Sequence, residues 1–142
     1  MTLTKAGGWA ALTCAATYLF GFALLLTVLA PLGYGSTQID GPAVVAFIRT
    51  SPGLMILWHS VIYILNAFAL AVLVAAVGGT APGAPLLRGL GFVWVTLVLG
   101  AGMLANVAVG QVVSQDSLAQ ARALWQVLHA VELGLGGGNE IA

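Results

Sequence analysis

Residues 54–77 read LMILWHSVIYILNAFALAVLVAAV, a stretch of 24 residues without a single Asp, Glu, Lys or Arg. A helix of about 20 mostly apolar residues is long enough to cross the hydrocarbon core of a bilayer. Inside lipid the backbone must satisfy its own hydrogen bonds, which only helices and closed barrels achieve, and the stretch lacks the alternation of a barrel strand. Residues 54–77 are therefore predicted to form a membrane-spanning helix.

Three further apolar stretches flank this one, at residues 9–32, 86–110 and 118–135, and the last is the least apolar. The chain of 142 residues is 61% hydrophobic and 6% charged, whereas an ordinary soluble domain is about 25% charged. The lipid bilayer is therefore the expected surroundings of most of its surface. The sequence predicts a single all-α transmembrane domain, an antiparallel four-helix bundle with spans at about 9–32, 54–77, 86–110 and 118–135.

Composition also excludes several classes of partner and site. The formal net charge is zero and no basic run exists, so the chain has no electrostatic footprint for nucleic acid. Its one cysteine, Cys14, can form neither an internal disulfide nor a metal motif built on paired cysteines. Cys14 is expected to be a small packing residue.

The first connection, residues 33–53, is predicted to hold one short helix. Asp40 precedes Gly41 and Pro42, a pattern typical of a capped helix with proline in its first turn, and residues 50–53 end it. This helix is too short to cross the bilayer and is expected to lie at the membrane interface. The other two connections, at residues 78–85 and 111–117, are short, which favours antiparallel neighbours.

The start of the fourth span and the orientation of the chain follow from few residues. Asp116 or Ser117 is placed to cap the last helix.

Lys5 and Arg88 fall on one side of the membrane, and Arg49 and Arg122 on the other, which balances the positive charges. Because the second pair falls within helices rather than free loops, we expect the N-terminus to be cytoplasmic.

Polar residues recur at helical spacing within the spans. At 100° per residue, each of the four spans carries one polar or small face: Thr13, Thr17 and Gly21; His59, Tyr63 and Asn66; Gly102, Asn106 and Gly110; Arg122, Gln126, His129 and Glu132. Ionisable side chains are costly inside a membrane and usually face a bundle interior. The candidate ligand-binding or cofactor-binding residues are His59, Tyr63, Asn66, Asn106, Gln126, His129 and Glu132.

Depth along the helices groups these residues further. At about 1.5 Å per residue, His129 lies about 16 Å and Glu132 about 21 Å into the fourth span. Asn66 lies about 18 Å into the second span, which enters from the same side, and His59 lies only about 8 Å deep. The sequence therefore predicts that Asn66 is level with the His129–Glu132 pair.

Four interpretations of the polar residues stay open. The first is a structural polar cluster, because Ser, Thr, Asn and Gln join helices in lipid. The second is a pocket for a small ligand or lipid, and the third is a haem site held by His59 and His129. The fourth is a proton-translocating site at Glu132. One His-x-x-Glu pair supplies only two metal ligands, and no nucleophile–base motif is present, so neither a metal site nor an enzyme is predicted. The expected role is a non-enzymatic accessory or binding subunit that contacts other membrane subunits or a second copy of itself.

The stretch Trp125-Gln126-Val127-Leu128-His129-Ala130-Val131-Glu132-Leu133-Gly134, followed by Gly136-Gly137-Gly138-Asn139-Glu140, carries a resemblance. It is similar to a group of small bacterial multi-pass membrane proteins of unknown function, in which a Gly-rich segment ending in Asn-Glu precedes a further span. The resemblance implies a helical fold in the bacterial inner membrane and a chain that continues beyond Ala142. It implies no activity.

Overall fold

The structure, a computed structural model, describes residues 2–34, 36, 38–77 and 83–137, and within them it is helical with no strand. An all-α fold is therefore confirmed. The Gly138-Asn139-Glu140 segment and the end of the chain lie outside the described residues. The elements, with η marking π- or 3₁₀-helical segments, are α1 (Leu3–Leu24), η1 (Leu25–Leu29), η2 (Ala30–Leu32), α2 (Gly41–Thr50), α3 (Pro52–His59), η3 (Ser60–Leu65), α4 (Asn66–Val77), α5 (Ala84–Val113), α6 (Leu118–Glu132) and η4 (Leu133–Gly137).

Three continuous helical segments of the described chain are long and apolar enough to cross a membrane. They are Leu3–Leu32, Pro52–Val77 and Ala84–Val113, with mean hydropathies of 2.0, 2.4 and 2.0. These segments correspond to the first three predicted spans. The fourth predicted span, residues 118–135, forms α6 and η4 but is not among them, because it is shorter and carries the polar residues of its stripe.

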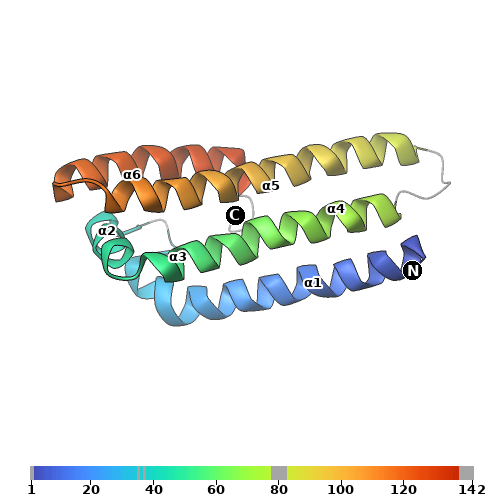
Figure 1. Cartoon of the computed structure of the whole chain (residues 1–142), viewed down its shortest axis with the longest axis horizontal. Helices are drawn as coiled ribbons and strands as arrows, with labels where there is room; N and C mark the ends of the chain where they lie inside the picture. Colours follow the sequence, from blue (N-terminus) through green and yellow to red (C-terminus); the bar gives the residue numbers. More distant parts are fainter. Residues whose placement is uncertain (1, 35, 37, 78–82, 138–142) are drawn as a thin grey trace.

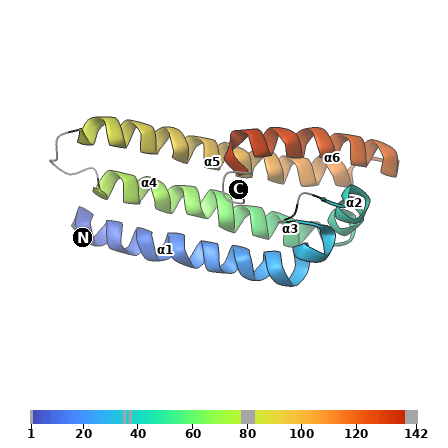
Figure 2. The ribbon, with the colours of Figure 1, turned by 180° about the vertical axis from the view of Figure 1, so that it is seen from behind.

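The long helices pack in chain order. α1 lies along α4, α4 along α5, and α5 along α6, while α2 sits across one end of the molecule (Figure 1). The view from behind shows the same order (Figure 2). Among the described residues, α1 and α6 are not a packed pair. At the α2 end, α2 packs on α3, α5 and α6, so elements from both halves of the chain converge there.

The predicted helix starts are confirmed in two places. The carboxylate of Asp40 accepts a hydrogen bond from the backbone N–H of Ala43 at 3.0 Å, and proline follows in the first turn of α2. The hydroxyl of Ser117 accepts from the N–H of Gln120 at 3.1 Å, so Ser117, not Asp116, caps α6. Each cap satisfies a donor that the first turn of a helix leaves without a partner.

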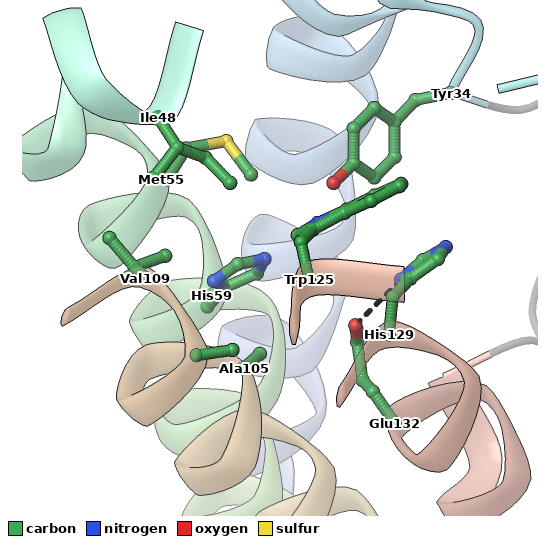
Figure 3. Close-up of a pocket in the computed structure, with 10 residues that line it drawn as sticks. Tyr34, Ile48, Met55, His59, Ala105, Val109, Trp125, His129 and Glu132 are labelled. Atoms are coloured by element: carbon green, nitrogen blue, oxygen red, sulfur yellow. Dashed lines mark hydrogen bonds and ion pairs between the residues drawn. The ribbon is translucent and has the colours of Figure 1, made fainter. Parts of the chain in front are cut away.

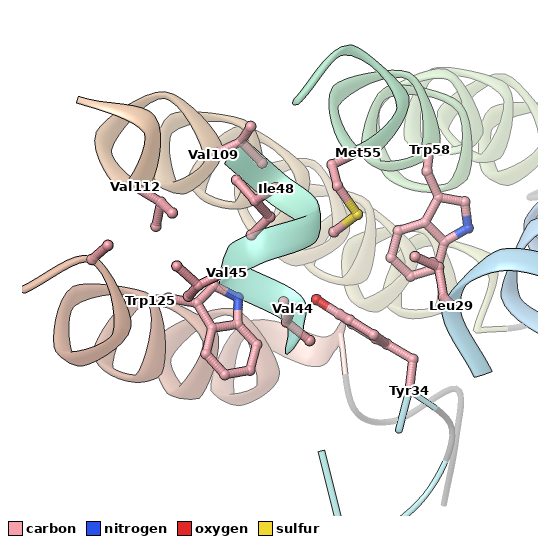
Figure 4. Close-up of a cluster of buried hydrophobic side chains, with 11 residues drawn as sticks. Leu29, Tyr34, Val44, Val45, Ile48, Met55, Trp58, Val109, Val112 and Trp125 are labelled. Atoms are coloured by element: carbon pink, nitrogen blue, oxygen red, sulfur yellow. The ribbon is translucent and has the colours of Figure 1, made fainter. Parts of the chain in front are cut away.

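The main core lies at the α2 end, and α2 is its centre (Figure 4). Val44, Val45 and Ile48 of α2 are at most 1% exposed and pack with aromatic side chains from the first connection, α3 and α6. The short helix expected at the membrane interface therefore turns its apolar face toward the protein. The physical reason is that buried apolar side chains of α3, α5 and α6 offer this face a protein surface to pack against.

Gly102 and Gly21 are two of the glycines at which the long helices approach closely. A Cβ added to Gly102 of α5 would overlap the Cβ of Tyr63, and one added to Gly21 of α1 would lie 2.5 Å from a methyl carbon of Ile62. Gly110, which shares the small-residue spacing with Gly102, has no neighbour of this kind within 4 Å. The predicted close-approach face of the third span is therefore used at Gly102 only.

Candidate functional site

A small cavity lies beneath α2, between α3, α5 and α6 (Figure 3). Its polar and aromatic lining consists of Tyr34, His59, Trp125, His129 and Glu132, and apolar side chains of α2, α3 and α5 complete the wall. The cavity leaves about 10 Å³ for the centre of a water-sized sphere, which is room for one water molecule. Three of the predicted site residues, His59, His129 and Glu132, therefore meet at one cavity.

His59 is the last residue of α3 and stands directly before the π-helical segment η3. It is 4% exposed, and its Nδ1 atom is buried without a hydrogen-bond partner among the described residues. The neighbouring Trp58 ring lies 5.2 Å from the imidazole, centre to centre. A buried polar atom without a partner is costly, so Nδ1 of His59 marks a place where a ligand or a water would be stabilising.

His129 and Glu132 form a pair on one face of α6. Nδ1 of His129 lies 3.1 Å from Oε2 of Glu132, one helical turn away. The Trp125 ring stacks on the imidazole at 4.9 Å with an interplanar angle of 12°, which fixes the orientation of His129. Nε2 of His129 is buried and has no partner among the described residues. Glu132 therefore engages one ring nitrogen of His129, and the other has no partner among the described residues.

Tyr34 closes the cavity from the first connection. Its ring meets Trp58 edge-on at 5.8 Å and His129 at 6.0 Å, and the side chain is buried. Burial raises the pKa of the Tyr34 phenol, the negative charge of Glu132 raises it further, and a hydrogen bond with Trp125 opposes both. Sequence reasoning missed Tyr34 and Trp125, because a single aromatic residue beside an apolar run is most often ordinary packing.

Asn66 does not line the cavity with His129 and Glu132. Its Oδ1 atom lies 3.1 Å from the hydroxyl of Thr17 on α1. The prediction that His59 and Asn66 share one helix face assumed α-helical spacing throughout, but η3 separates the two residues and is π-helical. A π-helical turn adds about one residue to an α-helical turn, so the residues after it are rotated about the helix axis by roughly 100°.

The remaining predicted residues also lie outside the cavity lining. Tyr63 is buried beneath it, with its ring 6.2 Å from that of His59. Asn106 donates from Nδ2 to the Ser60 hydroxyl at 2.9 Å, and its Oδ1 atom is buried without a partner among the described residues. Gln126 is exposed on the outer face of α6. Tyr63 and Asn106 therefore support the His59 end of the site, and Gln126 takes no part in it.

The cavity fits neither a metal ion nor haem. No group of three His, Cys, Asp or Glu side chains in the described ranges lies close enough to hold a metal. A haem between His59 and His129 would need far more space than one water, and Trp125 lies against the face of His129. The haem interpretation is therefore not taken further.

The arrangement suits hydrogen bonding and proton exchange with one small polar species. His59 and His129 line the cavity, each has one buried ring nitrogen without a partner among the described residues, and Glu132 contacts the other ring nitrogen of His129. Neither family models, nor curated proteins, nor solved structures gave a match when compared with this chain.

Proposed function

We propose that this protein is a non-enzymatic binding subunit of a membrane assembly, and that the cavity between α3 and α6 is its site for a small polar ligand. One observation carries the proposal: His59 and His129 line the same cavity, and each has a buried ring nitrogen without a partner among the described residues. Ionisable residues inside a membrane are costly and mark functional sites by default. A purely structural cluster would be expected to leave no donors or acceptors of this kind unpaired.

The proposed architecture is four antiparallel membrane segments, with α6 and η4 as the fourth. In Figure 1, α4 ends and α5 begins at the end of the molecule opposite α2, whereas α5 ends and α6 begins at the α2 end, which supports this arrangement. The proposed location is the bacterial inner membrane, with the N-terminus in the cytoplasm. The guanidinium of Arg49 donates to the backbone carbonyl of Gln115, so Arg49 is held within the protein and is not a free loop charge. That contact supports the proposed orientation.

Purification from native membranes in a mild detergent tests the binding-subunit proposal. We expect the tagged chain to migrate with at least one other polypeptide on a blue-native gel. The variant Glu132→Gln, inside the cavity, is expected to weaken this association, whereas Gln126→Ala on the outer face of α6 is expected to leave it unchanged. A chain that purifies alone from native membranes, with no retained small molecule, would contradict the proposal.

Proton-coupled transport is the second candidate, and Glu132 favours it. Glu132 is 8% exposed and is the one buried carboxylate among the described residues. Buried carboxylates and histidines serve as proton relays in pumps and transporters. The candidate predicts a proton flux in reconstituted liposomes that Glu132→Gln abolishes. An absence of flux in the wild-type protein would remove it.

A further inference from the structure

We propose that a second cavity, between α2 and the start of α6, binds one anionic membrane phospholipid, with the lipid phosphate at Arg122 and the adjoining apolar part of the lipid along the two helices. This cavity shares no lining residue with the one that His59 and His129 line. Lipid binding here goes beyond the proposed function, because it involves another surface and requires only that the protein lies in a membrane.

The second cavity, which we name the α2–α6 groove, is larger and more open than the first. Its volume is about 240 Å³, against about 10 Å³ for the cavity beside His59 by the same measure. Val45 is 1% exposed, whereas the other lining residues are exposed, so the groove opens at the molecular surface. Three residues of each helix line it: Pro42, Val45 and Ala46 of α2, and Leu118, Ala119 and Arg122 of α6.

The lining combines one positive charge with apolar side chains, and no carboxylate among the described residues lines it. No hydrogen bond or ion pair joins the guanidinium of Arg122 to another described residue. Arg49, the other arginine of α2 and α6, instead donates to the backbone carbonyl of Gln115. A guanidinium binds phosphate well, because its planar set of donors matches two phosphate oxygens. Arg122 is therefore available to bind a phosphate group.

Arg122 lies against the backbone at the start of α2. A Cβ added to Gly41 would lie 3.6 Å from Nε of Arg122, which is ordinary contact distance. Asp40, which precedes Gly41, accepts a hydrogen bond from the backbone N–H of Ala43 and forms no ion pair with Arg122. The positive charge is thus held at the junction of the two helices without an ion-pair partner among the described residues.

The place of the groove in the fold favours a lipid over a free anion. The apolar segments Pro52–Val77 and Ala84–Val113 both reach the α2 end of the molecule (Figure 1), and in the proposed membrane arrangement this end lies at the level of the lipid head groups. A free phosphate would contact Arg122 alone. A phospholipid also covers the exposed apolar side chains of Pro42 and Leu118, and apolar contact adds to electrostatic attraction at a membrane surface.

Native mass spectrometry of the purified protein in a mild detergent tests this site. The probes are phosphatidylglycerol, which is anionic, and phosphatidylcholine, which has no net charge, with the same acyl chains. We expect the wild-type protein to bind phosphatidylglycerol about fivefold more tightly, since one arginine near an anionic lipid surface has an effect of about this size. Arg122→Gln is expected to bind both lipids equally, and Arg122→Lys to keep part of the preference. Arg88→Gln, at an exposed arginine near the start of α5, is the matched control and should keep all of it.

Ala46→Phe tests the apolar wall of the groove. Ala46 is exposed in the lining, so a phenyl ring there occupies the groove and leaves Arg122 unchanged. We expect this variant to lose phosphatidylglycerol binding. Ala123→Phe is the control, because Ala123 is exposed on α6 outside the lining and its variant should bind as the wild type does. Inorganic phosphate in excess is expected to leave the lipid bound.

Equal binding of the two lipids by the wild-type protein would overturn the site, and this comparison does not depend on the folding of any variant. The same loss in Arg122→Gln and Arg88→Gln would indicate attraction to total charge. Unchanged binding in Ala46→Phe would place the lipid outside the groove, and displacement by inorganic phosphate would make a free anion the occupant. None of these measurements involves Glu132 or a co-purifying partner, so failure here is distinguishable from failure of the proposed function.

Discussion

The hydroxyl of Thr17 on α1 lies 3.1 Å from Oδ1 of Asn66 on α4, and each side chain is 3% exposed. The same hydroxyl lies 2.8 Å from the backbone carbonyl of Cys14. Small residues surround this contact, because Gly7, Ala10 and Gly21 make up the rest of the buried face of α1. Lipid supplies no hydrophobic drive between helices, so polar contacts and close packing must hold α1 in place.

Thr17→Val is therefore expected to weaken the packing of α1 on α4. Valine has nearly the shape of threonine but cannot form the hydrogen bond. Interhelical hydrogen bonds in membrane proteins contribute about 0.6 kcal/mol on average and at most about 1.7 kcal/mol. Unfolding by a denaturing detergent should show a loss in this range. Thr13→Val is the control, because the Thr13 hydroxyl is exposed and bonds within its own helix; equal losses in the two variants would contradict the role of Thr17.

Gly102→Ala is expected to be the more damaging change. The added methyl group would overlap the Cβ of Tyr63, an atom fixed to the backbone of the neighbouring helical segment η3, so this segment and α5 must separate. Overpacking of this kind costs about 1–3 kcal/mol. Gly100→Ala is the matched control, since its new methyl group meets nothing within 4 Å. Thermal unfolding in detergent should separate the two variants; the same melting temperature in both would show that the close approach is not required.

Trp58→Phe is expected to loosen the end of α1 that joins the first connection. Nε1 of Trp58 donates to the backbone carbonyl of Gly21 at 3.2 Å, across α1 and α3. A hydrogen bond of this kind contributes about 1 kcal/mol, and the loss should appear in the free energy of unfolding. Trp94→Phe serves for comparison, because Trp94 on α5 is 48% exposed. A larger loss at Trp94 than at Trp58 would argue against the contact.

Because the Tyr34 phenol is buried, we expect the stability of the protein to depend on pH in the alkaline range. Burial raises the pKa of Tyr34 in the folded protein above the ordinary value of 10.0. A raised pKa means that the unfolded chain releases the phenol proton at a lower pH than the folded protein does. The folded protein therefore loses stability relative to the unfolded chain as the pH rises above about 10. We expect wild-type protein to lose stability there more steeply than Tyr34→Phe. Ultraviolet absorbance of tyrosinate during the titration provides the measurement, and identical profiles would contradict the prediction.

The sequence predicted the helices well because their signals are local. Apolar length located Leu3–Leu32, Pro52–Val77 and Ala84–Val113 to within six residues at each end, and Asp40 marked the start of α2. The position of α2 was not predicted, because an apolar face on a short helix suits a membrane surface and a protein core equally. That choice depends on the space left by α3, α5 and α6.

The candidate site was predicted in part for the same reason. The spacing of three residues predicted that His129 and Glu132 lie together on one face, and they do because α6 is a regular α-helix between them. Counting residues put His59 about 8 Å shallower than His129. His59 and His129 nevertheless line the same cavity, because α6 extends farther than α3 at the α2 end (Figure 1). The sequence of one helix does not determine its position along a neighbouring helix. The π-helical segment that turns Asn66 toward α1 left no signal in the composition.

One residue, Ser51, both ends α2 and begins α3. A joint of one residue keeps the end of α2 beside the start of α3. Met55 and His59 of α3 line the cavity one and two turns beyond this joint, and Ile48 of α2 lines it from the other side of the joint. One wall of the buried site is therefore built from two helices that a single residue connects.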